Sequence, residues 1–283
     1  MELLDVSTMN FTTPEASTNL TTSTFNQMGM LNICTLSFHF MLGLPTHSYV
    51  IWHIVTGRGN GIASEFFNLS LSVCEIVLCL NSLFTILTTR FPILSTLMQF
   101  LLGLGITGRP LFQCLMCVER YLAVVHPVTF LNLKPLRYRL ICSFAAWIII
   151  FGSCFFCMFI ISVKFYIFMW FFSVQLLLFP SIQLFCCSAV LSALKQSGPG
   201  ERGREREEEN HIKRRAFYII LLITVSMVII YIPSTVTGFY RVLTHQNIPI
   251  LWMISQICFL MAGFVQPVLY LHRTGKLSCR CSP

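Results

Sequence analysis

Four Glu and Arg side chains lie inside the long apolar stretches of this 283-residue chain: Glu75, Arg109, Glu119 and Arg120. A charged group within a membrane-spanning helix is costly, and it therefore marks a candidate functional site. Arg109 and Arg120 are about three helical turns apart. Both side chains should thus point to the same side of one helix, about 16 Å apart along its axis.

Glu75 and Arg109 are expected at the same depth. Glu75 lies about 15 Å along a helix that begins near Glu65, and Arg109 lies a similar distance from the end of the next, antiparallel helix. We therefore predict a buried ion pair between Glu75 and Arg109. In the alternative, the long Arg109 side chain reaches an interface and Glu75 is protonated.

Other patterns do not assemble into a catalytic or metal site. The two Cys-x-x-Cys pairs, at 114–117 and 154–157, could supply four thiolates for zinc, but they fall in opposite halves of their segments and cannot meet. The chain has no His-Glu-x-x-His, Gly-rich phosphate loop or Gly-x-Ser-x-Gly motif. His39, His47 and His53 are best interpreted as packing residues. We expect no enzyme activity, no metal and no cofactor.

The composition is that of an integral membrane protein. Hydrophobic residues make up 55% of the chain and charged residues only 11%, and the mean hydropathy is +0.73. A soluble domain carries about a quarter charged residues. The 13 cysteines lie mostly in apolar runs, which indicates buried thiols rather than disulfides.

Seven apolar segments are each long enough to cross a membrane as a helix. They predict an all-α membrane protein, a seven-transmembrane helix bundle over residues 29–271. An N-terminal tail over 1–28 precedes it, a flexible inner loop over 195–215 interrupts it, and a C-terminal tail over 272–283 follows it. The segments are 29–55, 66–88, 93–122, 140–162, 166–192, 216–239 and 249–271.

The basic residues predict the orientation. With the N-terminus outside, 14 of the 19 Lys and Arg residues lie in inner loops and the inner tail, and three lie outside. The +8 net charge thus indicates membrane orientation and not binding to nucleic acid. The sequons at Asn10 and Asn19 agree with a glycosylated tail outside the plasma membrane, and no cleavable signal peptide is evident.

The three outer basic residues are Arg90, Lys164 and Arg241. They could bind an anionic ligand, or each could simply complement the dipole at a helix C-terminus. Cys279 and Cys281 lie among basic residues of the inner tail, a setting that suits palmitoylation.

The run CVERYLAVVHP, from Cys117 to Pro127, resembles the end of the third helix in rhodopsin-like (class A) G-protein-coupled receptors. The resemblance spans essentially the whole chain and is loosely closest to nucleotide- and lipid-receptor-like orphans of a fish-type group. The matching features are Glu119-Arg120-Tyr121, the fourth-helix Trp147, the fifth-helix Pro180, the sixth-helix Pro233, and Gln266-Pro267-Val268-Leu269-Tyr270, which resembles the Asn-Pro-x-x-Tyr motif.

Several positions depart from the family pattern. By the resemblance, Glu75 stands where the family has its sodium-binding Asp, and Arg109 occupies the cation's electrostatic role. His47 replaces the first-helix Asn, Gln266 the seventh-helix Asn, and Tyr231 the Trp of the sixth-helix switch. The resemblance also implies Glu119 as the resting partner of Arg120.

The resemblance implies a receptor that passes an extracellular ligand signal to heterotrimeric G proteins. A lipid or organic anion is the preferred ligand class, and membrane lipids surround the bundle. The alternative is a non-signalling seven-helix scaffold, decoy or dimer partner, which the substituted switch residues keep open. A transporter would need paired broken helices or a polar pore, which the segments do not show.

Overall fold

The structure is a computed structural model that describes residues 15–56, 65–132, 135–196, 231–246 and 248–273. In this part of the chain all regular structure is helical. The elements are α1 (Glu15–Thr56), α3 (Phe66–Leu87), the 3-10 turn η1 (Pro92–Leu94), α4 (Ser95–Val125), α5 (Pro127–Asn132), α6 (Pro135–Val163), α7 (Phe165–Gln196), a helix over 231–244, and α9 (Pro249–Arg273).

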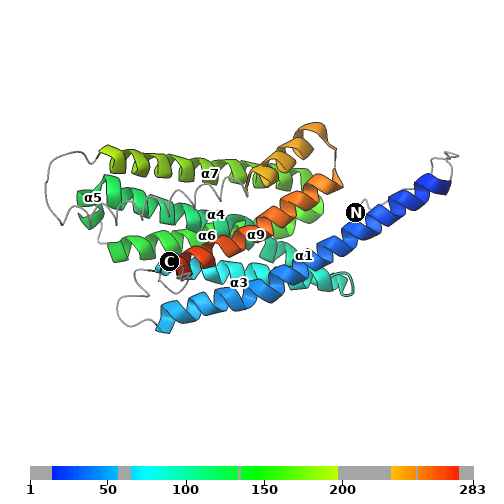
Figure 1. Cartoon of the computed structure of the whole chain (residues 1–283), viewed down its shortest axis with the longest axis horizontal. Coiled ribbons are helices and arrows are strands. Elements are labelled where there is room, and N and C mark those ends of the chain that lie inside the picture. The colour runs from blue at the N-terminus through cyan, green and yellow to red at the C-terminus, as the bar shows by residue number, and fades with distance from the viewer. Residues whose placement is uncertain (1–14, 57–64, 133–134, 197–230, 247, 274–283) are drawn as a thin grey trace, which may run out of the picture.

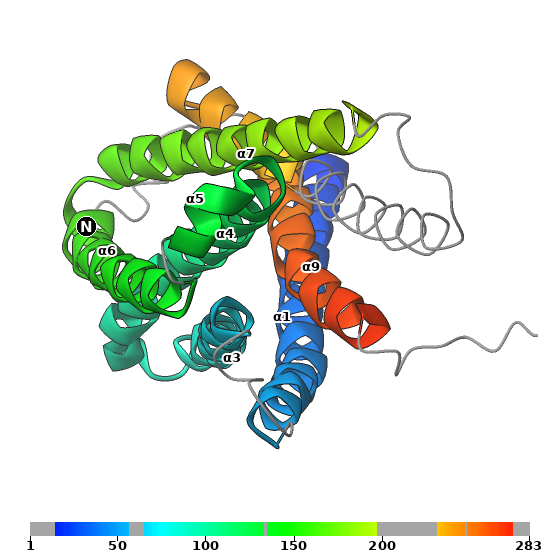
Figure 2. The ribbon, with the colours of Figure 1, turned by 90° about the vertical axis from the view of Figure 1, so that its left-hand side faces the viewer.

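The long helices lie side by side along the length of the molecule (Figure 1). We call the end where α4 stops, beside α5, the Arg120 end. The opposite end, where the helix over 231–244 stops and α9 begins, is the Arg241 end. Viewed along the bundle, α4 lies in the middle and packs against α3, α6 and α7, while α1 packs against α3 and α9 (Figure 2).

Five helices are long and apolar enough to cross a membrane, judged within the described residues. They are α3, η1 with α4, α6, α7 and α9. α1 is more polar because its apolar stretch is interrupted by polar residues that include three histidines. Of the predicted sixth segment, 216–239, only residues from 231 onward lie within the described part, so its start stays a prediction.

The helices begin and end somewhat differently from the apolar segments. α1 begins at Glu15, within the predicted tail over 1–28, and α7 continues to Gln196, into the start of the predicted loop over 195–215. A hydropathy pattern predicts where the apolar part of a helix lies. The helix itself can continue beyond that part through polar residues. The location of the tail outside the cell stays a prediction.

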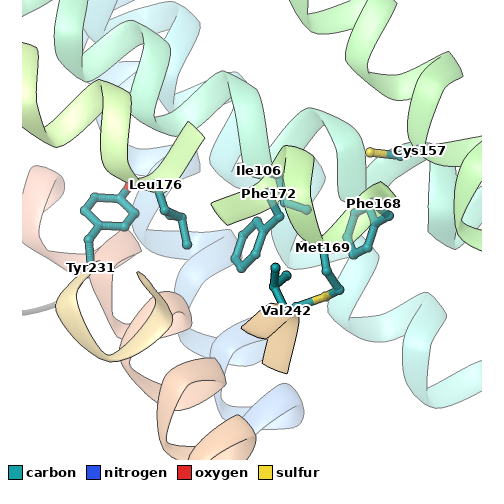
Figure 3. Close-up of a cluster of buried hydrophobic side chains, with 8 residues drawn as sticks. All are labelled: Ile106, Cys157, Phe168, Met169, Phe172, Leu176, Tyr231 and Val242. Carbon is teal, nitrogen blue, oxygen red and sulfur yellow. The ribbon is translucent and has the colours of Figure 1, made fainter. Parts of the chain in front are cut away.

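Two apolar clusters form most of the core. One, shown in Figure 3, joins α4, α6, α7 and the helix over 231–244, with Tyr231 beside Leu176 at one side of the cluster. The other joins α3, α4 and α6 and includes Phe112 and Ile150. Large apolar side chains such as Phe144 and Phe185 are instead exposed on the outside of α6 and α7, as expected for surfaces that contact lipid.

Prolines inside the helices free backbone carbonyls for contacts between helices. Pro180 cannot donate to the carbonyl of Leu176, and the hydroxyl of Thr235 lies 3.5 Å from that oxygen. Pro267 likewise leaves the carbonyl of Gly263 in α9 without its helical donor. The Thr235 contact joins the sixth helix to α7 where Pro180 interrupts the helical hydrogen bonds of α7.

Candidate functional site

Glu75 of α3 and Arg109 of α4 form a bidentate ion pair in the centre of the bundle. Arg109 Nε donates to Glu75 Oε1 at 2.5 Å, and Nη2 donates to Oε2 at 2.6 Å. The two side chains are 2% exposed or less. The contact that the helical spacing predicts is therefore present, in the fork geometry that gives the strongest Arg–carboxylate bonds.

α9 closes over this ion pair. The third nitrogen of the guanidinium, Nη1, donates to the carbonyl of Phe259, and the Phe259 ring lies 4.6 Å below the guanidinium carbon. One turn further on, a Cβ at Gly263 would lie 2.9 Å from Glu75 Oε2 and 3.1 Å from Arg109 Nη2. The pair thus joins three helices, and it depends on a glycine that lets the α9 backbone approach.

Two histidines of α1 lie on the same side of the bundle interior. His39 is hydrogen-bonded to Ser82 of α3 (Nδ1 to Oγ, 3.0 Å), whereas Nδ1 of His47 is buried with no hydrogen-bond partner among the described residues. Both side chains are at most 2% exposed. The two imidazoles are therefore enclosed within the helix bundle.

Tyr231 lies next to this assembly at the start of the described sixth helix. Its hydroxyl donates to Gln113 Oε1 of α4 at 3.3 Å, and its ring meets the Phe259 ring edge to face, with centroids 6.5 Å apart. Tyr231 is 1% exposed and Gln113 is 4% exposed. Neither Gln113 nor Phe259 was identified from the sequence, because an apolar or neutral residue in a helix carries no signal of its own.

At the Arg120 end, Glu119 is held by an ion pair with Arg139 of α6, whose Nε lies 3.0 Å from Glu119 Oε1. This partner was not predicted from the sequence, because Arg139 is one of several basic residues in a predicted inner loop and nothing in the sequence distinguishes it. Arg120 itself is exposed at the end of α4. The contact expected between Glu119 and Arg120 stays a prediction.

Tyr121, the third residue of this motif, contacts the following loop and α7. Its hydroxyl lies 3.2 Å from His126 Nε2, and its ring centroid lies 6.1 Å from that of Phe185. The end of α4 is thereby connected to α6 through Glu119 and to α7 through Tyr121.

The motif around Pro267 connects α9 to α3 and α1. The Gln266 side-chain amide nitrogen lies 3.4 Å from both the carbonyl and the side-chain oxygen of Asn68. The Tyr270 hydroxyl lies 3.1 Å from His53 Nδ1, and the two rings meet edge to face.

Pro233 lies one turn from Thr237, whose hydroxyl donates to the Pro233 carbonyl at 2.6 Å.

Of the three basic residues expected at the ligand mouth, Arg241 packs against aromatic side chains of neighbouring helices. Its guanidinium carbon lies 4.6 Å from the Phe165 ring centre and 5.6 Å from that of Trp252, so that rings from α7 and α9 contact it. Burial lowers the pKa of this guanidinium from its ordinary value, which still leaves it cationic at neutral pH. Arg90 and Lys164 are exposed.

The remaining predicted sites lie outside the described residues or show no cluster. Asn10, Cys279 and Cys281 belong to the former group, and Asn19 lies within α1. None of the eleven cysteines within the described part forms a disulfide, and Cys154 and Cys157 pack in two separate apolar clusters. Among those described residues, no three His, Cys, Asp or Glu side chains gather in a way that could hold a metal ion.

The described residues thus form a bundle of long apolar helices with an ion pair across its centre and the Glu119-Arg120-Tyr121 motif at one end, the arrangement of a helical membrane protein. The family model of the 7 transmembrane receptor (rhodopsin family) matches residues 47–270, and the chain belongs to this family of class A G-protein-coupled receptors. It is therefore a multi-pass membrane protein with a seven-helix bundle, in a family whose members are generally not enzymes.

Several curated receptors are similar to this chain. Hydroxycarboxylic acid receptor 2 of Homo sapiens is 24% identical over 275 residues, which cover 83% of this chain and 72% of that receptor. The uracil nucleotide/cysteinyl leukotriene receptor of Homo sapiens is 28% identical over 152 residues, or 48% of this chain and 41% of that receptor. The Rattus norvegicus hydroxycarboxylic acid receptor 2 is 25% identical over 225 residues, 70% of this chain and 59% of its own length.

Proposed function

We propose that this receptor detects an extracellular ligand at the plasma membrane and activates heterotrimeric G proteins. The observation that carries the proposal is Arg120, which stands exposed at the end of α4 within the family's acidic-Arg-Tyr motif. The neighbouring contacts of Glu119 with Arg139 and of Tyr121 with Phe185 connect this end to α6 and α7. A G protein that engages Arg120 would therefore act on helices that pack directly against α4.

The proposed orientation has the N-terminus outside and the Arg120 end in the cytoplasm. The strong excess of Lys and Arg in the loops and tail on the side of Arg120 supports it. In this orientation the Arg241 end faces the extracellular side, and Asn10 and Asn19 would be glycosylated. Cys279 and Cys281 would lie in the cytoplasmic tail, where palmitoylation could anchor the tail to the membrane.

The proposed ligand is a lipid or an organic anion. Arg241 is the residue proposed to bind an anionic group of the ligand. Two aromatic rings contact its guanidinium at the Arg241 end, and the guanidinium keeps its positive charge. The names of the similar receptors point to the same chemistry, since hydroxycarboxylic acids carry a carboxylate and nucleotides carry phosphate. Arg90 and Lys164 would add positive charge around the mouth.

The ion pair is proposed to take the place of the family's sodium site. The Arg109 guanidinium already neutralises Glu75 and fills three of its own donor positions with Glu75 and Phe259. A sodium ion beside Glu75 would have to displace this cation, at the cost of a buried bidentate bond.

A second candidate function is a non-signalling seven-helix scaffold, decoy or dimer partner. It is favoured by three substituted switch positions, where His47, Tyr231 and Gln266 stand in place of the family's usual residues. Tyr231 and Gln266 nevertheless form hydrogen bonds between helices.

The test is ligand-free G-protein activation across all subtypes, for wild type and Arg120→Ala at matched surface expression. Basal activity that disappears in the variant supports the signalling receptor and names its pathway. Equal basal output from wild type and variant, above that of untransfected cells, would contradict the role of Arg120.

A further inference from the structure

Tyr231 is held from two sides by residues that belong to other helices. On one side Gln113 of α4 accepts the hydrogen bond of the Tyr231 hydroxyl at 3.3 Å. On the other side the Phe259 ring of α9 meets the Tyr231 ring edge to face. Because Tyr231 and Gln113 are almost fully buried, water cannot readily replace either contact.

Phe259 is in turn fixed by the ion pair. Arg109 binds the Phe259 carbonyl through Nη1 and lies 4.6 Å from its ring centre. A continuous set of contacts therefore leads from Glu75 through Arg109 and Phe259 to Tyr231 and back to α4 at Gln113. Arg109 and Gln113 are four residues apart on α4 and so lie on the same face of that helix.

We propose that Gln113 and Phe259 are positioning residues that keep Tyr231, and with it the sixth helix, against α4 in the ligand-free receptor. The proposal rests on the proposed signalling function. The bond between Tyr231 and Gln113 joins the sixth helix to α4 two residues before Pro233. In this proposal the sixth helix lies further from α4 at Tyr231 in the signalling state, which requires this bond to break. Loss of the bond by substitution therefore favours the signalling state and raises basal activity.

The Tyr231 hydroxyl and the Gln113 amide can be removed separately and together. We would compare basal G-protein activation per surface receptor for wild type, Tyr231→Phe, Gln113→Leu and the double variant. Each single variant is expected to raise basal output about two- to ten-fold, the range that one net hydrogen bond corresponds to. The double variant should match the single variants, because the same bond cannot be lost twice.

Phe259→Leu tests the second contact. It removes the aromatic ring but keeps an apolar side chain and the carbonyl that Arg109 binds. Basal output should rise here as well, and an unchanged output would remove Phe259 from the proposal.

The chain offers a matched control for each substitution. Tyr240→Phe removes a hydroxyl that also donates to a glutamine, Gln246, at 3.2 Å, but at the Arg241 end of the same helix. Gln99→Leu removes an amide of α4 that accepts from Ser162 at 3.1 Å, several helical turns before Gln113 in the same helix. Both control variants should keep the basal output of wild type.

If Gln113→Leu does not reach the surface, Gln113→Met replaces it, since methionine has a similar length and adapts its shape. Single effects that multiply in the double variant would overturn the proposal, as would an unchanged output. Arg120→Ala in each background separates this failure from that of the signalling function. A basal signal that needs Arg120 but ignores Gln113 and Tyr231 overturns only the positioning role. No signal in any well-expressed variant overturns both.

Discussion

Gly263 of α9 lies against Glu75 of α3 so closely that a Cβ there would be 2.9 Å from the carboxylate oxygen Oε2. Real Cβ atoms essentially never approach another heavy atom so closely, so the helix or the ion pair would have to shift. The seventh helix is therefore positioned on a buried charge pair by the absence of a single methyl group.

Gly263→Ala is expected to destabilise the receptor by about 1–3 kcal/mol, the usual cost of adding a carbon to a filled interior. Thermal unfolding of the purified receptor would measure it. Gly152→Ala in α6 is the matched control, because nothing lies within 4 Å of a Cβ at that position. That control should stabilise the helix slightly, since alanine is a better helix former than glycine. Equal effects of the two variants would contradict the close packing at Gly263.

Reversal of the charges tests the ion pair itself. Glu75→Arg and Arg109→Glu each leave like charges buried together and should lower surface expression strongly, because an uncompensated buried charge costs about 3–5 kcal/mol. The double variant restores opposite charges and should recover part of the expression. The recovery is incomplete, since a carboxylate at position 109 cannot donate to the Phe259 carbonyl. A double variant no better than the worse single variant would rule out the pair as a determinant of stability.

Signalling and ligand affinity should not depend on sodium. At fixed ionic strength, replacement of sodium by choline is expected to leave both unchanged, because the Arg109 guanidinium already occupies the position beside Glu75. The double variant Glu75→Asp with Arg109→Ser serves as the comparison, since it removes the guanidinium and restores an aspartate. A sodium-dependent shift in the wild-type receptor would refute this prediction.

Arg241 should contribute the positive charge that an anionic ligand needs. Thermal unfolding of the purified receptor in a panel of short-chain and fatty carboxylates and nucleotides would show which compounds stabilise it. Arg241→Gln is expected to abolish that stabilisation. Arg241→Lys should retain only part of it, because lysine stacks poorly between two rings. Arg137→Gln, which changes an exposed cation at the Arg120 end of α6, is the control. Full stabilisation of Arg241→Gln would assign the anion to another site.

Much of this architecture follows from the sequence because it depends on composition and helical period. Apolar segments of membrane-spanning length require helices, since the bilayer offers backbone groups no other hydrogen-bond partner. The depth of Glu75 and of Arg109 follows from the rise per residue. Two opposite charges at one depth are expected to pair, because an isolated charge in apolar surroundings has a high free energy. The Glu119-Arg120-Tyr121 and Pro267 motifs indicate the receptor family without any coordinates.

The tertiary structure decided which neutral groups complete these contacts. The Phe259 carbonyl, the Gly263 backbone and the Gln113 amide carry no sequence signal, because every helix has carbonyls and many have a glycine or glutamine. Their roles depend on the rotation and the distance between helices, which no period along one helix determines. For the same reason the structure placed Arg139 beside Glu119 and gave Arg241 two aromatic neighbours. The sequence by itself thus determined the helices, their charges and the depth of each charge, whereas the packing of one helix against another decided what each charge binds.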